Sequence, residues 1–323
     1  MIKVAVVITT YNLEEYIGQA LESVLNQKTN FEYKIIVADD CSTDKTLEII
    51  NDFKNKYPQK IEVLSSSKNQ GSLVNSNRVF NGLQCVYFTF LDGDDYWVND
   101  NRLQMQVDYL DEHPEHMLCG ANTQYLRDGV LKELVIPPDK TGKSYSFQDL
   151  INNTVPFVHT SAILVRNTIF INGLPACYKN AENTFENCAL RGEDFRRILH
   201  LEQGDMYIMP DVFSVYRIHS RGVWQGSSEA KQNIEGAIAA NFYRKYFEGK
   251  YDGYFDNNAH RAYREMMKIL VTEYGLLNDY QLNEKETLLF TSLLNDIYKE
   301  RSTETVNSKF KRKLMRALIK FFF

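Results

Sequence analysis

Three aspartates lie close together after one apolar segment of the chain. Residues 87–91 are mostly apolar, and Asp92, Asp94 and Asp95 follow directly, with Gly93 between the first two. Like charges at this spacing repel one another unless a cation lies among them. Carboxylate oxygens suit Mg²⁺ and Mn²⁺, and such a cation binds diphosphate oxygens. The segment therefore predicts a divalent-metal site, whereas a single Asp-Gly pair would be explained equally well as an acidic turn.

A second acidic pair, Asp39 and Asp40, follows the apolar segment 33–38. A carboxylate at this place can accept a hydrogen bond from a nucleobase or a ribose. The alternative is that Asp40, Ser42 or Thr43 caps the next helix, because short polar side chains favour helix N-termini. The two interpretations are compatible, and both remain open.

Polar residues also follow the first apolar segment. The run Thr9, Thr10, Tyr11 and Asn12 offers hydroxyls, an aromatic face and an amide that can frame a nucleobase. Asn12, with Glu15 three residues later, equally fits the N-terminus of the helix that follows.

The apolar segments before these polar residues have the length and composition of buried strands. Helical periodicity separates them, which is the order of βα units around a largely parallel sheet. The carboxyl ends of parallel strands meet at one edge of a sheet, where such folds bind ligands. We expect the polar runs to meet there. The expected strands are 4–9, 33–38, 61–64 and 87–91, and the expected helices begin near residues 12, 42 and 72.

The rest of the chain divides into two parts. Between residues 117 and 217 the pattern predicts short strands, at 161–165 and 212–217, and a helix at 193–201. Beyond residue 228 helical periodicity dominates, at 233–247, 260–274 and 284–300. We therefore expect a catalytic domain over 1–227, with a nucleotide-binding half (1–100) and an acceptor-binding half (101–227), and a C-terminal helical region over 228–323.

Composition excludes several classes of protein. The 323 residues carry a net charge of −5, so no global field attracts nucleic acid. Five cysteines without a C-x-x-C pair favour reduced thiols and a cytoplasmic location. The apolar run at the N-terminus is too short for a signal peptide or a membrane span.

The segment 309–323 has six cations, no acids and an apolar stripe. A basic amphipathic helix of this kind can lie on an anionic membrane surface, which predicts peripheral contact with the inner face of the cytoplasmic membrane. The alternative is that it docks on the protein's own core or on a second copy of the chain. Both alternatives remain open, as does homo-oligomerisation.

Two common nucleotide-binding motifs are missing. Gly142, Lys143 and Ser144 match the end of a P-loop, but Pro137 occupies the position of its earlier glycine. The first turn also lacks G-x-G-x-x-G, which removes the main argument for a dinucleotide-binding dehydrogenase.

Five motifs in register carry a resemblance to a known family. The runs 9–12, 39–44 and 92–95, the segment Lys68-Asn69-Gln70-Gly71 with Arg78, and the run 192–194 resemble glycosyltransferase family 2 in order and spacing. The likeness covers about residues 1–220. It implies the GT-A fold, an α/β architecture with a Rossmann-like mixed sheet flanked by helices, here followed by a C-terminal helical extension.

The resemblance implies a metal-dependent, inverting transfer of a sugar from a nucleotide diphosphate sugar, expected to be UDP-linked, to a glycan or lipid-linked acceptor. Asp39 would contact the base, and Asp94 would be the principal ligand of Mn²⁺ or Mg²⁺, with Asp92 and His219 as further ligands. Asp95 is not separable from Asp94 by sequence. The implied donor-binding residues are Thr9, Tyr11, Asn12, Asp39, Asn69, Arg78, Asp92 and Gly93.

By the same resemblance Asp194 is the catalytic base, which takes the proton of the acceptor hydroxyl. Its structural alternative is an acid at a helix N-terminus. His219 also fits a surface histidine after an edge strand. Glu193, His159 and Trp224 are weaker candidates for contacts with the acceptor.

The sequence departs from the family pattern at two places. Cys41 stands where a glycine is usual, and residues 72–75 replace a run of small residues, which puts the donor contacts of Arg78 in doubt. Two other functions remain as alternatives, a sugar nucleotidyltransferase, although its Gly-rich N-terminal loop is absent, and a catalytically silent nucleotide-binding or glycan-binding protein.

Overall fold

The computed structural model describes residues 1–219, 222, 227–272 and 283–302. One mixed sheet has the strand order β3-β2-β1-β4-β9-β6-β10-β5, with β7 beside β6 and β8 beside β10. The first four strands of this order are parallel, whereas β9 runs antiparallel to both β4 and β6. The strands are β1 (Ile2–Thr10), β2 (Tyr33–Asp39), β3 (Ile61–Ser65), β4 (Cys85–Asp92), β5 (Tyr96–Trp97), β6 (His116–Arg127), β7 (Val130–Leu134), β8 (Lys143–Tyr145), β9 (Leu164–Arg166) and β10 (Asp205–Ile218).

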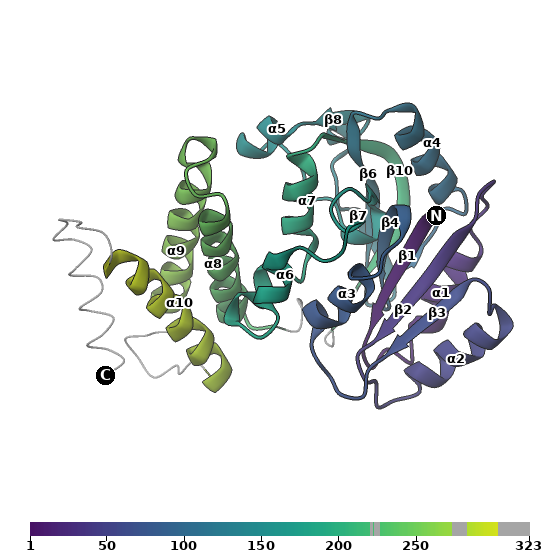
Figure 1. Ribbon diagram of the computed structural model, residues 1–323, viewed down its shortest axis with the longest axis horizontal. Coiled ribbons are helices and arrows are strands. Elements are labelled where there is room, and N and C mark those ends of the chain that lie inside the picture. Colours follow the sequence, from purple (N-terminus) through teal and green to yellow (C-terminus); the bar gives the residue numbers. More distant parts are fainter. Residues whose placement is uncertain (220–221, 223–226, 273–282, 303–323) are drawn as a thin grey trace.

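Helices cover both faces of this sheet (Figure 1). In β1, Val4, Val6 and Ile8 point to one face and Ala5 and Val7 to the other, as the two-residue period of a strand requires. The first face packs against α1, α2 and α4, and the second against α3, α6 and α7. The helices are α1 (Ile17–Leu25), α2 (Thr46–Lys56), α3 (Ser72–Phe80), α4 (Arg102–Glu112), α5 (Phe147–Ile151), α6 (Ala176–Ala181), α7 (Glu193–Leu201), α8 (Glu229–Tyr246), α9 (Tyr254–Thr272) and α10 (Glu284–Ser302).

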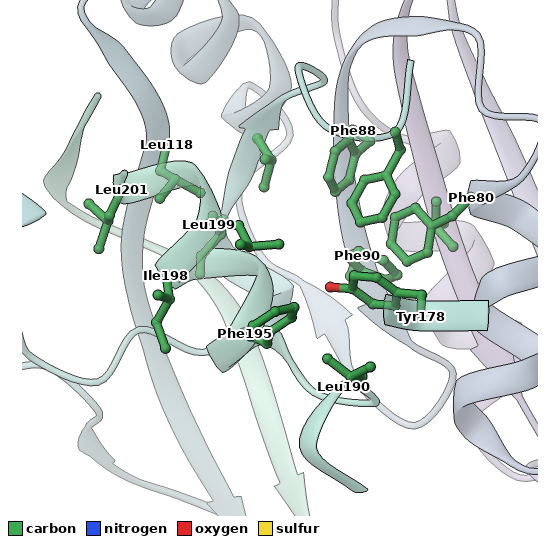
Figure 2. Packing of buried hydrophobic residues seen from close by; sticks show 14 of the residues in the cluster. Phe80, Phe88, Phe90, Leu118, Tyr178, Leu190, Phe195, Ile198, Leu199 and Leu201 are labelled. Carbon is green, nitrogen blue, oxygen red and sulfur yellow. The ribbon is translucent and has the colours of Figure 1, made fainter. Parts of the chain in front are cut away.

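Aromatic side chains join α7 to the sheet and to the C-terminal helices. Figure 2 shows Phe88 and Phe90 of β4 beside Phe80, with Phe195 of α7 in the same cluster. Phe195 also stacks on Tyr243 of α8, with ring centroids 5.5 Å apart. A separate apolar cluster holds α8, α9 and α10 together, through residues such as Ile238, Met266 and Phe290. The helices beyond residue 228 therefore contact the helix that begins at Glu193.

Several boundaries differ from the sequence prediction. The expected strand at 161–165 is a short 3₁₀ turn followed by β9, because the carbonyl of Ser161 accepts hydrogen bonds from Trp97 Nε1 (2.9 Å) and from buried Arg102. The expected helix start at 42 or 43 was wrong. α2 begins at Thr46, whose N–H donates to Asp44 (2.9 Å). The helix predicted at 193–201 is confirmed as α7.

No helix in the described part of the chain is long and apolar enough to cross a bilayer. The basic segment 309–323 lies outside the described residues, so its predicted membrane or subunit contact stays a prediction. The boundary predicted between residues 227 and 228 also stays a prediction.

Candidate active site

The carboxyl ends of three parallel strands bring the polar runs together. Thr9 of β1 pairs with Ala38 of β2 on one side and with Asp92 of β4 on the other. Thr10 pairs with Asp39. The Thr9 hydroxyl donates to Asp92 Oδ1 at 3.4 Å. The residues predicted to share one sheet edge therefore lie side by side.

The carboxylates at the end of β2 are engaged by the chain itself. Asp39 is buried and accepts hydrogen bonds from both the N–H (3.0 Å) and the hydroxyl of Ser42. Asp40 accepts from the N–H groups of Gln70 and Gly71, both at 2.8 Å. These two acids fasten the loops that follow β2 and β3.

Asn12 is not the N-cap that its spacing to Glu15 predicted. Its φ is 54°, its Oδ1 accepts the N–H of Thr43 (2.8 Å), and α1 begins at Ile17 with Tyr16 in the capping position. A turn in which the Tyr16 N–H donates to Leu13 separates Asn12 from the helix. Asn12 therefore joins the loops after β1 and β2, while Tyr11 is 46% exposed.

Gly93 allows the chain to turn tightly after β4. Its N–H donates to the Thr9 carbonyl at 3.1 Å. A Cβ at this position would lie 3.2 Å from the Thr10 side chain and 3.1 Å from Leu13, closer than ordinary packing allows. This close approach keeps the acidic run against the end of β1.

Asp94 contacts His219. The Asp94 Oδ2 lies 3.0 Å from His219 Nε2, and the His219 ring packs on Tyr16 with centroids 5.0 Å apart. Arg217, near the end of β10, donates to the Asp94 carbonyl and to Gln19 Oε1 (2.7 Å). The end of β10 is thereby fixed to the acidic run.

Asp95 is fully buried, and only one of its two oxygens is hydrogen-bonded. Its Oδ1 accepts the N–H of Arg217 (2.9 Å), whereas Oδ2 has no hydrogen-bond partner among the described residues. His159 Nδ1 lies 3.7 Å from that oxygen, and the His159 ring stacks on Tyr216. One ligand atom from each of Asp92, Asp95 and His159 falls within 4.8 Å of the others.

The electrostatics of this cluster favour a bound cation. Burial, together with the charges of Asp94 and Glu193, raises the pKa of Asp92 to about 7. Burial and the neighbouring acids also raise the pKa of Asp95 well above its usual range. Burial lowers the pKa of His159 to about 4, which keeps its ring neutral and able to bind a metal. The buried Asp95 Oδ2, which has no hydrogen bond in the described structure, and the carboxylate oxygens around it are ligands that suit Mg²⁺ or Mn²⁺.

The first turn of α7 faces the acidic cluster. Glu193 lines a cavity together with Phe90, Thr160 and Arg196, and its charge acts on Asp92. Asp194 points elsewhere: its side chain is 59% exposed, and its Oδ1 pairs with Arg197 at 2.7 Å. Adjacent positions of one helix thus offer one acid toward Asp92 and one toward solvent.

Other predicted residues lie further from this cluster or outside the described chain. Asn69 is exposed in the loop before α3. Arg78 donates to the Ser65 carbonyl (2.9 Å) and to Asn75 (3.2 Å), so it fastens α3 to β3. Trp224 lies outside the described residues.

The sequence prediction missed two residues that shape the site. Arg196 is buried, lies 4.3 Å from the centre of the Phe90 ring, and lowers the pKa of Asp92 through its charge. Arg217 joins the end of β10 to Asp94 and Asp95. A signal for Arg196 existed, because it follows Glu193 at the three-residue spacing that brings side chains onto one helix face.

Comparison with known proteins defines the class. Residues 5–174 match the model of glycosyl transferase family 2. In structure, Staphylococcus aureus TarS 1–349 in complex with UDP-GlcNAc aligns with a TM-score of 0.60 at 18% identity, covering 91% of this chain and 80% of that one. The mannosyltransferase PcManGT from Pyrobaculum calidifontis, in complex with GDP-Man and Mn²⁺, aligns with a TM-score of 0.51 at 14% identity, covering 98% and 80%. The fold is that of the GT-A glycosyltransferases.

In sequence, the chain is 29% identical over 223 residues to the uncharacterized protein Rv1520 of Mycobacterium tuberculosis, covering 69% of this chain and 61% of the relative. It is 30% identical over 196 residues to the poly(ribitol-phosphate) beta-N-acetylglucosaminyltransferase TarS of Staphylococcus aureus, covering 57% and 31%. The chain therefore spans 61% and 31% of the length of these two relatives, in each case less than two thirds. It belongs to glycosyltransferase family 2.

Proposed function

We propose that this protein is a metal-dependent, inverting glycosyltransferase that moves a sugar from a UDP-linked donor to a hydroxyl of a glycan or lipid-linked acceptor in surface polysaccharide synthesis. The observation that carries this proposal is the cluster of Asp92, Asp94 and Asp95 at the sheet edge, which faces Glu193 in the first turn of α7. Family membership and a relative named as a beta-N-acetylglucosaminyltransferase support it.

The donor would lie across the carboxyl ends of β1, β2 and β4. Asp39 and the exposed ring of Tyr11 are the proposed contacts of the base, with Thr9, Asn12, Asn69, Arg78 and Gly93 around the nucleotide. The UDP-GlcNAc of the TarS structure and the GDP-Man of the PcManGT structure are donors of this class.

Asp94, Asp92 and His219 would hold Mn²⁺ or Mg²⁺, with Asp95 and His159 beside them. When bound, the cation supplies positive charge to the diphosphate leaving group. The Mn²⁺ of the PcManGT structure supports a metal in this fold. Arg196 adds a fixed positive charge next to Asp92.

In the proposed reaction the acceptor oxygen forms a bond to the anomeric carbon as the bond from that carbon to the diphosphate breaks. The proton of the acceptor hydroxyl passes to the Asp194 carboxylate, and attack from the face opposite the nucleotide inverts the anomeric configuration. A base of this kind contributes about 10² to 10⁴-fold to the rate. Asp194 would have to leave Arg197 to act, whereas Glu193 already faces the cluster and would orient the acceptor.

The experiment is nucleotide release from a panel of UDP and GDP sugars with and without Mn²⁺, followed by transfer to acceptors and determination of the product anomer. We expect Mn²⁺-dependent release of the nucleotide diphosphate. Asp194→Asn should keep donor affinity and lose transfer about 10² to 10⁴-fold, with Glu193→Gln as the matched neighbour that loses less.

Two outcomes would overturn the proposal, and a third would reassign the base. Pyrophosphate exchange would indicate a nucleotidyltransferase, and donor binding without turnover in the presence of acceptors would indicate a silent binding protein. A larger loss in Glu193→Gln than in Asp194→Asn would move the base to Glu193. Contact with a membrane, self-association and a cytoplasmic location remain proposals that this experiment does not address.

A further inference from the structure

A second group of metal-binding side chains lies far from the acidic cluster. His113, Glu115 and His116 occupy the turn between α4 and β6. β6 begins at His116, next to Asp205 at the start of β10, whereas the acidic cluster lies beside the region where Gln124 pairs with Val215. Gln124 lies eight positions beyond His116 along β6, a distance of roughly 25 Å. The two groups therefore cannot share one ion.

The spacing of the ligand atoms suits a small tetrahedral cation. The Nδ1 atoms of His113 and His116 each lie 3.2 Å from Glu115 Oε1, and the three atoms fall within 4.8 Å of one another. Zn²⁺ binds histidine nitrogen and carboxylate oxygen at about 2.0–2.2 Å, so its neighbouring ligands are about 3.3 Å apart. The two separations from Glu115 Oε1 match the edge of such a tetrahedron.

Backbone hydrogen bonds and a proline hold the turn that carries these side chains. The His116 N–H donates to the His113 carbonyl (3.1 Å), and Pro114 between them fixes one backbone angle. The Glu115 carbonyl accepts the N–H of Asp205 (3.0 Å), and a Cβ at Gly204 would collide with that carbonyl. The backbone therefore fixes the positions from which the three side chains extend.

His116 has the surroundings of a metal ligand. Its residue is only 5% exposed, and its Nε2 lies 2.9 Å from the Ser144 hydroxyl on β8. Its Nδ1 is buried and makes no hydrogen bond within the described part of the chain, and that atom faces Glu115. In metal sites a hydrogen bond on one ring nitrogen sets the tautomer and the ring orientation, and leaves the other nitrogen for the ion. The His113 ring is oriented in turn by Tyr109, with centroids 4.3 Å apart.

We propose that His113, Glu115 and His116 form a Zn²⁺ site that is separate from the candidate active site. Two imidazoles and one carboxylate favour Zn²⁺ over Mg²⁺, which prefers oxygen ligands alone. Three protein ligands leave the fourth position for water. Through the turn and Ser144, the ion would connect the end of α4 to β6 and β8. It would stabilise the end of β6 that lies away from the acidic cluster.

The test is calorimetric titration of the metal-stripped full chain with ZnCl₂ alone. We expect a strong equivalent that the wild-type protein shares with Asp94→Ala. His113→Ala and Glu115→Gln, whose side chains are exposed enough for the fold to tolerate the change, should bind that equivalent at least tenfold more weakly. Ser144→Ala should bind about tenfold more weakly, because it removes the hydrogen bond that orients His116. His260→Ala, an exposed histidine on α9, is the matched control and should bind like the wild type.

Zn²⁺ should also raise the melting temperature of the wild-type chain and leave that of His113→Ala unchanged. Replacement of Zn²⁺ by Co²⁺ should give the visible absorption of a tetrahedral site, lost in the same variant. The proposal is overturned if the wild type binds no strong equivalent of Zn²⁺, if His113→Ala binds it like the wild type, or if Asp94→Ala abolishes it.

Discussion

The acids at the end of β2 and those at the end of β4 occupy the same edge of the sheet in opposite surroundings. Asp39 and Asp40 accept hydrogen bonds from the N–H and hydroxyl of Ser42 and from the N–H groups of Gln70 and Gly71. Asp95, by contrast, keeps a buried oxygen without a hydrogen bond in the described structure.

The difference teaches how to separate structural acids from functional ones of the same type. A buried carboxylate that receives backbone N–H groups is stabilised as an anion by the chain itself. Asp92 and Asp95 have raised pKa values, because burial disfavours their charged forms and each neighbouring charge adds to that effect. Repulsion within such a group lowers the stability of the metal-free fold, and a bound cation offsets that repulsion. The comparison predicts that substitution of Asp40 acts mainly on stability, whereas substitutions after β4 act mainly on metal-dependent activity.

The largest effect is expected for Asp94→Ala. Loss of the carboxylate paired with His219 should lower Mn²⁺-dependent release of nucleotide diphosphate by at least about 10²-fold, since a metal contributes several kcal/mol to the stabilisation of the leaving group. Steady-state release of the nucleotide measures it. Asp100→Ala, an exposed acid that pairs with Lys28, is the control and should keep full activity. Equal rates in the two variants would contradict the functional role of the β4 acids.

Asp40→Ala should act on stability instead. Two backbone N–H groups would lose a charged acceptor, which should lower the free energy of unfolding by about 3 kcal/mol. Urea denaturation measures this, and Mn²⁺ calorimetry on the folded variant should give the wild-type affinity. A variant that is as stable as the wild type but binds no Mn²⁺ would reverse the proposed division.

A smaller effect is expected from pH, through Asp92. The usual pKa of an aspartate is about 3.9, and that of Asp92 in the folded chain is about 7. The folded state therefore binds this proton more tightly than the unfolded state. The stabilising contribution is complete below about pH 4 and is lost as the pH rises through 7. Because Mn²⁺ competes with the proton, its affinity should rise about tenfold between pH 6 and pH 8.

Calorimetry with Mn²⁺ at several pH values, and thermal denaturation of the metal-free chain, measure the two sides of this linkage. Asp92→Asn should remove the Asp92 contribution to both pH dependences. A Mn²⁺ affinity that stays constant from pH 6 to pH 8 would show that Asp92 does not titrate in this range.

The smallest effect is expected for Asp95→Asn without metal. An amide can still accept the N–H of Arg217, and the raised pKa of Asp95 shows that its buried surroundings disfavour a negative charge. The free energy of unfolding should change by less than about 1 kcal/mol, measured by urea denaturation of the metal-free protein. A loss comparable to that of Asp40→Ala would mean that both pairs of acids serve the fold in the same way.

Local patterns in the sequence were sufficient for the order of the elements up to Asp92 and for the sheet edge. The apolar segments before Thr9, Asp39 and Asp92 predicted the strands, because a strand that is buried on both faces is a short run of consecutive apolar residues. The same holds for α7, whose boundaries agree with the prediction.

What the sequence could not predict depends on contacts between distant residues. Asp40 reaches Gln70 across 30 positions and Arg217 reaches Asp95 across 122, and no local pattern records either contact. Asn12 fits a helix N-terminus by spacing, but its side chain meets Thr43 instead. The different directions of Glu193 and Asp194 likewise depend on the packing of α7 against the sheet.

The packing of Phe195 between the sheet and α8 has a consequence for protein engineering. A chimera that exchanges the segment after residue 228 between relatives would replace Tyr243 and its neighbours, and would remove the support of the helix turn that carries Glu193 and Asp194. A successful graft would therefore have to transfer α7 and α8 together.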